Sequence, residues 1–392
     1  MLLHESNSSR RGAIAPLAAL LLIPLLAMLA FAVDLGWITH THNQLQAAAD
    51  AAALAGAGSL TDNFVKFNLM GVTAAQKTAL RADGVTRATA TARTFAGYHP
   101  AGEVANLNLL AADVELGYTS PAGVYTTPAA ASVYPNTVKV TLRRETAANG
   151  PLPLFFARVL GIDTVPLTAT ARATIYGTGG VDTLTAGAGI LPMTYDVNHW
   201  DNFVATGKDP DGNTKYAADG YPHLNVYPSI KFTGNFGELS LNQSNNGSST
   251  IRNWIADGIT ASDVAALQAD RLIPLSAHNS NSPPDWKGNP GLKTSTIQEV
   301  GNYIGEVYLL PLFKPVKSAP GNYQAGEGQG SNYYYTIVRF VPVLITAVDA
   351  TGNDKAINVR PTAYIDPDSV YSTTPTAATA SHFVFIGAKL VD

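Results

Sequence analysis

The chain has 392 residues, of which 46% are hydrophobic and 14% charged, and its formal net charge is −4 at pH 7. This length can hold an anchoring segment and one or two globular domains. The absence of cysteine excludes disulfides, thiol nucleophiles and cysteine-ligated metal centres, and the acidic balance argues against nucleic-acid binding.

An apolar run near the N-terminus predicts a membrane anchor. Residues 13–33 carry no charged or hydrogen-bonding side chain, and as a helix they span about 31 Å, close to the hydrocarbon thickness of a bilayer. We predict a transmembrane helix over residues 13–38. Pro24 is expected to kink it, and Trp37 is expected to lie at the membrane surface.

The charges around this run predict its orientation. Arg10 and Arg11 precede it, and no lysine or arginine follows until Lys66. The positive-inside rule therefore places a basic tail, residues 1–12, in the cytoplasm. The expected location is the inner (cytoplasmic) membrane, crossed once, with the bulk of the chain in the periplasm or outside the cell.

The alternative to a retained anchor is a cleaved signal peptide. Residues 30–32, Ala-Phe-Ala, fit a cleavage site after such a peptide. The apolar run is longer than the usual core of a signal peptide, which is about 7–15 residues, so its length favours a retained anchor.

The helix is predicted to continue beyond the membrane as an alanine-rich stalk over residues 39–60. Small and apolar residues recur there at alternating spacings of three and four, which places them on one stripe of a helix. The residues expected to pack are Leu45, Ala49, Ala52 and Gly56. Their partner is either a helix of another chain or the domain that follows, and the stripe fits both.

Asp34 is a charged residue at the end of the apolar run and has two interpretations. The first is that its carboxylate meets the lipid headgroups. The second is that it pairs with a basic group on a neighbouring anchor and sets the register of a helix bundle.

The first sixty residues resemble a known family. They contain R-R-G-A-x-A, then an apolar span that ends A-V-D-x-G, then Q-L-Q-A-A-A-D-A-A-A-L-A-G-A. This order is similar to the N-terminal module of the Tad (tight-adherence, Flp-type) pilus-assembly proteins of the TadE/TadG-like group. The resemblance implies a protein that crosses the membrane once and is associated with a type IV-like pilus or secretion machine. The residues that carry it are Arg10, Arg11, Gly12, Asp34, Gly36, Gln44, Leu45, Gln46, Ala49, Asp50, Ala51, Ala52, Ala53, Leu54, Ala55 and Gly56.

Two features depart from relatives of this group. True pilins carry glutamate at the fifth position after the glycine of their cleavage signal, where this chain has Leu17. Some longer relatives carry a von Willebrand A-like module marked by D-x-S-x-S, a string that is absent here. Neither prepilin processing nor metal-dependent adhesion is therefore carried over to this chain.

The exported part is predicted to be α+β, with mixed helices and antiparallel strands. Residues 61–176 form a small α+β region, and residues 177–189 form a Gly/Thr-rich linker. Residues 190–392 form a loop-rich and strand-rich domain. In the first region we expect a helix over 73–96, strands over 113–118, 137–143 and 169–176, and a short apolar helix over 154–160.

Two further strands are expected in the second region, over residues 304–313 and 334–345. Each contains a proline, Pro311 and Pro342, which argues for sheet edges or bulges. Residues 230–236 are also expected to form a strand and turn, and two short helices are expected over 251–257 and 261–268.

The residue types that carry chemistry are sparse. His40 and His42 are two apart, so on a helix they point in different directions and cannot share a metal. Residues 209–213, Asp-Pro-Asp-Gly-Asn, are better explained as an Asx/Gly turn than as a Ca²⁺ loop, and residues 366–368 as another turn. We predict no catalytic residue, metal site or cofactor.

The predicted function is therefore a non-enzymatic, membrane-anchored component of a Tad/Flp-type pilus assembly or secretion apparatus. It would act through helix packing and contacts of the exported domain. The expected partners are the lipid bilayer, other proteins of the apparatus and, through the N-terminal helix, a second copy of the chain. The alternative is a membrane-anchored extracytoplasmic enzyme or carbohydrate-binding module, which a polar cleft with convergent carboxylates would favour.

Overall fold

The structure is a computed structural model. It describes residues 14–120, 122–177, 181, 183–227, 236–244, 247–275, 284–290, 292–319, 322–329, 332–351, 355–365 and 384–391. The basic tail with Arg10 and Arg11, most of the strand expected over 230–236, and the turn expected at 366–368 lie outside these residues.

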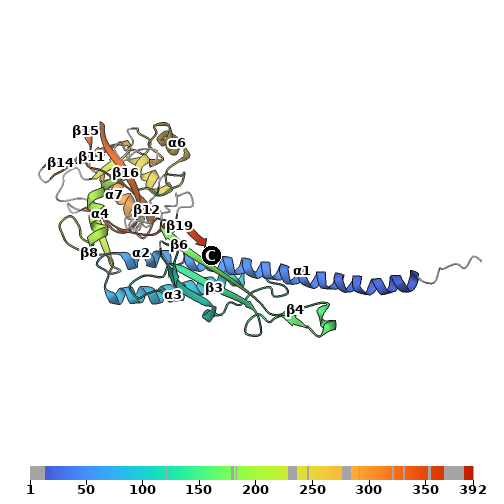
Figure 1. Ribbon diagram of the computed structural model, residues 1–392. Helices are drawn as coiled ribbons and strands as arrows, with labels where there is room; N and C mark the ends of the chain where they lie inside the picture. Colours follow the sequence, from blue (N-terminus) through green and yellow to red (C-terminus); the bar gives the residue numbers. More distant parts are fainter. Residues whose placement is uncertain are drawn as a thin grey trace, which may run out of the picture.

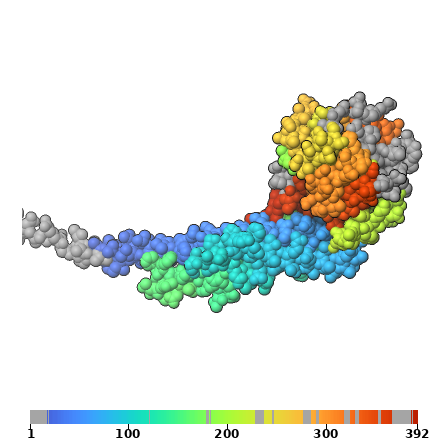
Figure 2. All heavy atoms as spheres, turned by 180° about the vertical axis from the view of Figure 1, so that it is seen from behind, coloured from blue at the N-terminus to red at the C-terminus, as the bar shows by residue number. Residues whose placement is uncertain are grey.

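The described residues form an α+β protein, which confirms the predicted fold class. A long N-terminal helix leads into two bodies (Figure 1). The stalk body comprises residues 39–177 with the strands at 364–365 and 384–390, and the distal body comprises the described residues between 181 and 361. The distal body sits at the end of the stalk body that is remote from the free end of the helix (Figures 1 and 2).

Helix α1, Ile14–Gly58, runs through the apolar segment and the stalk without a break and continues through Pro24. Its apolar side chains between Leu20 and Leu35 are largely exposed, for example Ile23 at 70% and Met28 at 73%. Among the described residues, it is the one helix region long and apolar enough to cross a membrane. The burial pattern reverses at residue 45, beyond which most residues on one face are fully buried.

The stalk stripe packs on the chain itself. Leu45, Ala49 and Ala52 are fully buried in a core shared with helix α3, Ala74–Gly97, and with the first sheet. A Cβ atom on Gly56 would lie 3.2 Å from Val138 Cγ1 and 3.3 Å from the Ala88 carbonyl oxygen. Small residues therefore let the α1 backbone approach helix and sheet closely. Two partners were considered for the stripe, a helix of another chain and the domain that follows, and the structure contains the second.

The stalk body joins α1 and α3 to a six-stranded sheet of order β18-β19-β6-β3-β1-β2. Predicted strands over 137–143 and 169–176 correspond to β3 and β6, and all of β3 pairs antiparallel with residues 167–174 of β6. The bounds are α2 Thr61–Asn68, η1 Ala111–Asp113, β1 Val114–Thr119, β2 Tyr125–Thr126, β3 Thr137–Arg144, β4 Leu152–Pro153, η2 Ala157–Leu160, β5 Thr164–Val165, β6 Leu167–Gly177, β18 Tyr364–Ile365 and β19 Val384–Leu390.

The stalk body is built from both ends of the described chain. Strand β19 pairs antiparallel with β6 on the side opposite β3, so residues 384–390 return to the sheet that residues 114–177 begin. The division at residues 177–189 stays a prediction. In the structure, the sheet formed by strands before this division also includes β18 and β19, which come after it in the chain.

The distal body is built around a second, mainly antiparallel sheet of order β11-β10-β7-β12-β16-β17-β9-β8, with β15 paired to β16. One core contains Trp200 and Phe203 of α4, and the other contains Trp254 and Trp286. The bounds are β7 Met193–Asp196, α4 Val197–Thr206, β8 Lys215–Tyr216, β9 Pro222–Tyr227, β10 Phe236–Leu239, α5 Ser248–Asp257, α6 Ala261–Ala269, β11 Asp285–Pro290, α7 Thr294–Gly301, β12 Val307–Phe313, β13 Lys317–Ala319, β14 Asn322–Gln324, β15 Glu327–Gln329, β16 Asn332–Asp349 and β17 Ala356–Pro361.

The two prolines lie in interior strands, so of the two expected settings, edges or bulges, the edge is excluded for both. Strand β12 lies between β7 and β16, and β16 lies between β12 and β17. Pro311 directly precedes the first residue of β12 paired with β7, and Pro342 lies just outside the β16–β17 ladder. An interior strand accepts proline at such a position because no ladder bond requires its missing N–H. A bulge does follow Pro311, between Leu312 and Phe313.

The two bodies meet at the turn between β8 and β9. The Gln76 side chain of α3 donates a hydrogen bond to the Gly220 carbonyl oxygen at 3.0 Å. Asp219 in the same turn accepts a hydrogen bond from buried Arg360 of β17. Burial alone would raise the pKa of the Asp219 carboxyl, but hydrogen bonds from Arg360 and the Tyr221 backbone outweigh burial and hold the pKa below its ordinary value.

Gly56→Val should destabilise the stalk body by about 1–3 kcal/mol, since the added side chain overpacks the contact with Val138 and Ala88. Thermal unfolding of the full chain in detergent measures this change. Gly58→Ala is the matched control, because a Cβ at Gly58 meets nothing within 4 Å. Equal melting temperatures for the two variants would contradict the close packing.

Asp219→Asn should lower stability near neutral pH and have no effect in strong acid. The folded pKa of Asp219 is lowered, so its contribution is complete above the unfolded value of about 3.9 and is lost as the pH falls through the folded pKa. Melting temperatures of variant and wild type should therefore converge once the pH falls below the folded pKa of Asp219. Asp257→Asn, at an exposed site at the end of α5, is the control.

Candidate functional site at the anchor–body junction

The junction between the anchor and the stalk body is organised by Asp34. This residue is 4% exposed although it lies on the part of α1 whose apolar neighbours are exposed. Its carboxylate accepts hydrogen bonds from the backbone N–H groups of Phe155 at 2.8 Å, Phe156 at 3.1 Å and Ala157 at 2.7 Å. Asp34 thus holds the segment that leads into η2 against α1.

Asp34 therefore supplies hydrogen-bond acceptors for the N–H groups at the start of η2, although it lies in a distant part of the chain. The residue at the N-cap of η2 is Phe156, whose side chain makes no capping hydrogen bond. The first N–H groups of a helix need acceptors, and a carboxylate is the strongest that a side chain offers. The structure thereby gives Asp34 partners within its own chain, which neither sequence interpretation included. Pairing with a neighbouring anchor stays a prediction.

Trp37 reinforces the same contact one turn further along α1. Its indole N–H donates a hydrogen bond to the Pro153 carbonyl oxygen at 3.2 Å. Its ring lies 5.6 Å from the Phe155 ring and stacks with His40 at 6.1 Å. Trp37 is half-buried, so a residue expected at the membrane surface also fastens the strand β4 to the helix.

A buried arginine holds the other side of the hairpin that carries η2. Arg144 at the end of β3 is 1% exposed. Its guanidinium donates to the Ala101 carbonyl oxygen at 2.6 Å, to Gly150 at 2.9 Å and to the Glu103 carboxylate at 2.6 Å. Sequence reasoning missed this residue. The alternation of β3 could have found it, because Val138, Val140 and Leu142 face the core and Arg144 continues that series.

An apolar groove of about 240 Å³ lies between α1 and η2. Asp34 is one of its lining residues. The remaining wall comprises Ala27, Ala30 and Phe31 of α1 with Phe156, Ala157, Val159 and Leu160.

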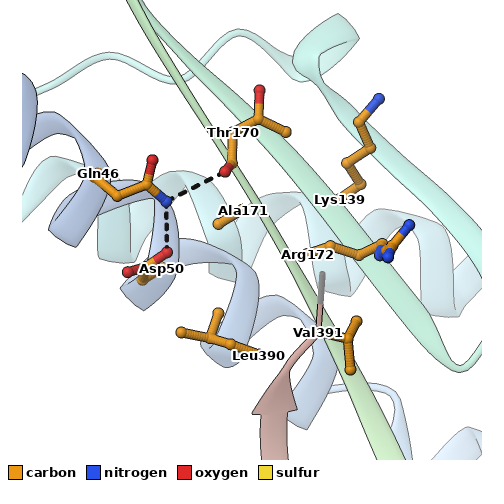
Figure 3. Close-up of a pocket in the computed structure, with 8 residues that line it drawn as sticks. All are labelled: Gln46, Asp50, Lys139, Thr170, Ala171, Arg172, Leu390 and Val391. Atoms are coloured by element: carbon orange, nitrogen blue, oxygen red, sulfur yellow. Dashed lines mark hydrogen bonds between the residues drawn. The ribbon is translucent and has the colours of Figure 1, made fainter.

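A second, more polar groove of about 350 Å³ lies along the stalk (Figure 3). The Gln46 amide of α1 donates to Asp50 Oδ1 at 2.8 Å and to the Thr170 carbonyl oxygen at 3.2 Å, which links the helix to β6. Lys139, Arg172, Ala171, Leu390 and Val391 complete the lining. Asp50 is the single carboxylate in this lining, so the groove does not present the paired acids that hydrolytic chemistry uses.

The other chemical candidates have structural roles or are dispersed. Asp209 Oδ1 accepts hydrogen bonds from the Asp211 and Asn213 backbone N–H groups at 3.0 and 2.9 Å, which is an Asx turn. His40 and His42 are exposed on α1. Within the described residues, no group of three or more histidines and carboxylates could hold a metal ion.

The residues that organise the junction from the side of α1, Asp34 and Trp37, both lie in the first sixty residues. Residues 12–59 match the family model Tad, whose description is "Putative Flp pilus-assembly TadE/G-like". The resemblance of the N-terminal module to the TadE/TadG-like group is therefore confirmed. No curated protein and no solved structure matches the chain.

The matched module coincides with α1 almost residue for residue, since α1 covers Ile14–Gly58. It contains the exposed apolar segment, the Asp34 junction and the buried stalk stripe. The predicted site residues therefore fall into two groups: Leu45, Ala49, Ala52 and Gly56 lie together in the stalk core, while Pro24, Asp34 and Trp37 lie on the anchor side. The matched module thus contains both the exposed apolar segment and a helix of the stalk core.

Replacing Asp34 should release the η2 segment from α1. Asp34→Asn keeps one acceptor oxygen for three N–H donors, at an expected cost of about 1–3 kcal/mol. Trypsin cleavage after exposed Arg158, followed by mass spectrometry in detergent, should then be about tenfold faster or more. The control is Thr39→Ala, an exposed position on the same helix. Unchanged cleavage at Arg158 would contradict the capping role.

Proposed function

We propose that this chain is a non-enzymatic, membrane-anchored component of a Tad/Flp-type pilus assembly or secretion apparatus. It crosses the inner membrane once, with residues 1–12 in the cytoplasm and both bodies on the other side. The match of residues 12–59 to a pilus-assembly family supports the association with this apparatus. The exposure of the apolar half of α1 supports a lipid-embedded anchor, because water disfavours such a surface.

The observation that carries the proposal is the continuity of α1 from the exposed apolar segment into the protein core. A flexible linker would let the exported bodies move freely relative to the membrane. An unbroken helix instead sets the distance of the distal body from the membrane, since the part of α1 from Asp34 to Gly58, along which the stalk body packs, spans about 36 Å. Such a shaft suits a protein that acts by presenting surfaces to other components of an assembly.

Self-association is proposed for the membrane segment of α1 and not for the stalk stripe. Leu45, Ala49 and Ala52 are covered by α3 and the first sheet, so a second chain cannot reach them in the folded protein. The exposed apolar residues before Asp34 are free of such cover. Contacts between anchors would therefore form within the bilayer, where helices pack through small side chains.

The proposal predicts that the intact chain co-purifies with apparatus proteins. A tagged full-length chain is extracted from the envelope with detergent, its partners are identified, and its N-terminus is determined by mass spectrometry. We expect an N-terminus before residue 13 and proteins of a Tad-type apparatus in the eluate. The matched control replaces residues 13–33 by a cleavable signal peptide, which should export the two bodies and greatly reduce recovery of those proteins.

A mature N-terminus beyond residue 30, together with no recovery of apparatus proteins, would overturn the proposal. Recovery of the same proteins by the control would show that the exported bodies alone make the contacts. That result would contradict the proposal that these contacts depend on the anchor.

A further inference from the structure

The segment that Asp34 holds ends in a cluster of exposed apolar side chains. We call residues 154–162 the apolar tip; η2 lies within it. Val159 is 88% exposed and Leu160 is 81% exposed, and both belong to a nine-residue stretch with one charged residue, Arg158. Phe155, Phe156 and Ile162 are exposed by 58%, 47% and 53%. A cluster of this kind indicates a surface that is covered in the working molecule.

The tip lies beside the membrane segment of α1 and not beside the stalk. The groove between them is lined by residues of α1 from Ala27 to Asp34, and Val159 and Leu160 form its opposite wall. Seven residues of helix correspond to about 10 Å. The tip therefore extends about 10 Å from the level of Asp34 along the segment that enters the bilayer. Both views show the hairpin with β4 alongside the exposed part of the helix (Figures 1 and 2).

We propose that the apolar tip inserts into the outer half of the bilayer next to α1 and is covered there by lipid acyl chains. This inference rests on the proposed membrane anchor and adds a second point of membrane contact. The continuity of the tip with the lipid-facing surface of α1 identifies the occupant, because acyl chains that cover Phe31 also reach Phe156 and Leu160 across the groove. The depth agrees with that of interfacial elements, which bury their apolar side by about 5–10 Å.

The backbone of the tip is suited to lipid because its N–H groups are largely satisfied internally. Bilayer hydrocarbon offers no hydrogen-bond partner, so a segment can enter only if its backbone bonds to the protein. Asp34 accepts from residues 155–157, which would otherwise need water. Further hydrogen bonds run from backbone N–H groups to backbone carbonyl oxygens. They join Leu154 to Asp163, Val159 to Phe156, Gly161 to Arg158 and Ile162 to Ala157, with the donor named first in each pair.

The polar groups around the tip fit the boundary of the membrane. Trp37 and Phe155 lie in contact at the level where α1 leaves the bilayer, and aromatic rings are favoured at this depth. Arg158 is exposed on η2 and has a stem long enough to place its guanidinium among phosphate groups. Together with α1, the tip would fix the orientation of the stalk body about the helix axis.

The absence of cysteine from the chain makes a direct test possible. Single cysteines are introduced into the full chain as Val159→Cys, Leu29→Cys and Val124→Cys, and each is labelled with an environment-sensitive fluorophore. All three sites are exposed apolar positions, so labelling should preserve the fold. The proteins are reconstituted into phosphatidylcholine–phosphatidylglycerol vesicles in which a fraction of the lipids carries nitroxide groups on the acyl chains.

We expect strong quenching at Val159 and Leu29 and little at Val124, which lies in the β1–β2 loop of the stalk body. Shallow and deep nitroxides should place the label at Val159 about 5–10 Å below the headgroup boundary. Quenching at Leu29 without quenching at Val159 would overturn the inserted tip and leave the anchor standing. Absence of quenching at both positions would overturn the anchor as well, which separates the two failures. Quenching at Val124 equal to that at Val159 would also refute the tip as a specific contact.

Discussion

One helix has to suit two environments, and the rest of the molecule depends on how it does so. The first half of α1 exposes large apolar side chains, and the second half buries alanine and glycine against α3 and the first sheet. Because no break separates the halves, the packing of the stalk also fixes the rotation of the exposed apolar half about the helix axis. That rotation determines which face meets the groove at Ala27 and Phe31. The small residues of the stripe thus influence the orientation of a part of α1 that they do not contact.

Two buried charges fix the hairpin between β3 and β6, and both are satisfied mainly by backbone groups. Asp34 accepts from N–H groups, and Arg144 donates to carbonyl oxygens and to Glu103. Bonds from a charged group to oriented backbone dipoles are short and geometrically specific. They also leave buried charges compensated where water is excluded. The hairpin is therefore held at two places: Arg144 binds it near the end of β3, and Asp34 binds the residues that lead into η2.

The sequence determines the local elements of this fold and leaves their long-range partners open. Periodicity identified α1, β3 and β6, since apolar spacing depends only on neighbouring residues. It could not show that the stripe ending at Gly56 meets Val138, or that Asp34 meets Phe155, a residue 121 positions away. A carboxylate at the end of an apolar run has the same local pattern whether its partner is a headgroup, another helix or a distant N–H. The edge expected from Pro311 and Pro342 failed for the same reason, because whether a strand accepts proline depends on where it pairs with its neighbours.

The return of β19 to the first sheet has a consequence for how the protein is made. Residues 114–177 are synthesised well before residues 384–390, so β6 first forms with one side unpaired. Such a side can recruit strands from other polypeptides and is a common starting point of aggregation. The late pairing also gives the sheet a high contact order, which slows folding. The first sheet can therefore be completed only after the whole of the distal body has been synthesised, and until then the open side of β6 has to be shielded from other strands.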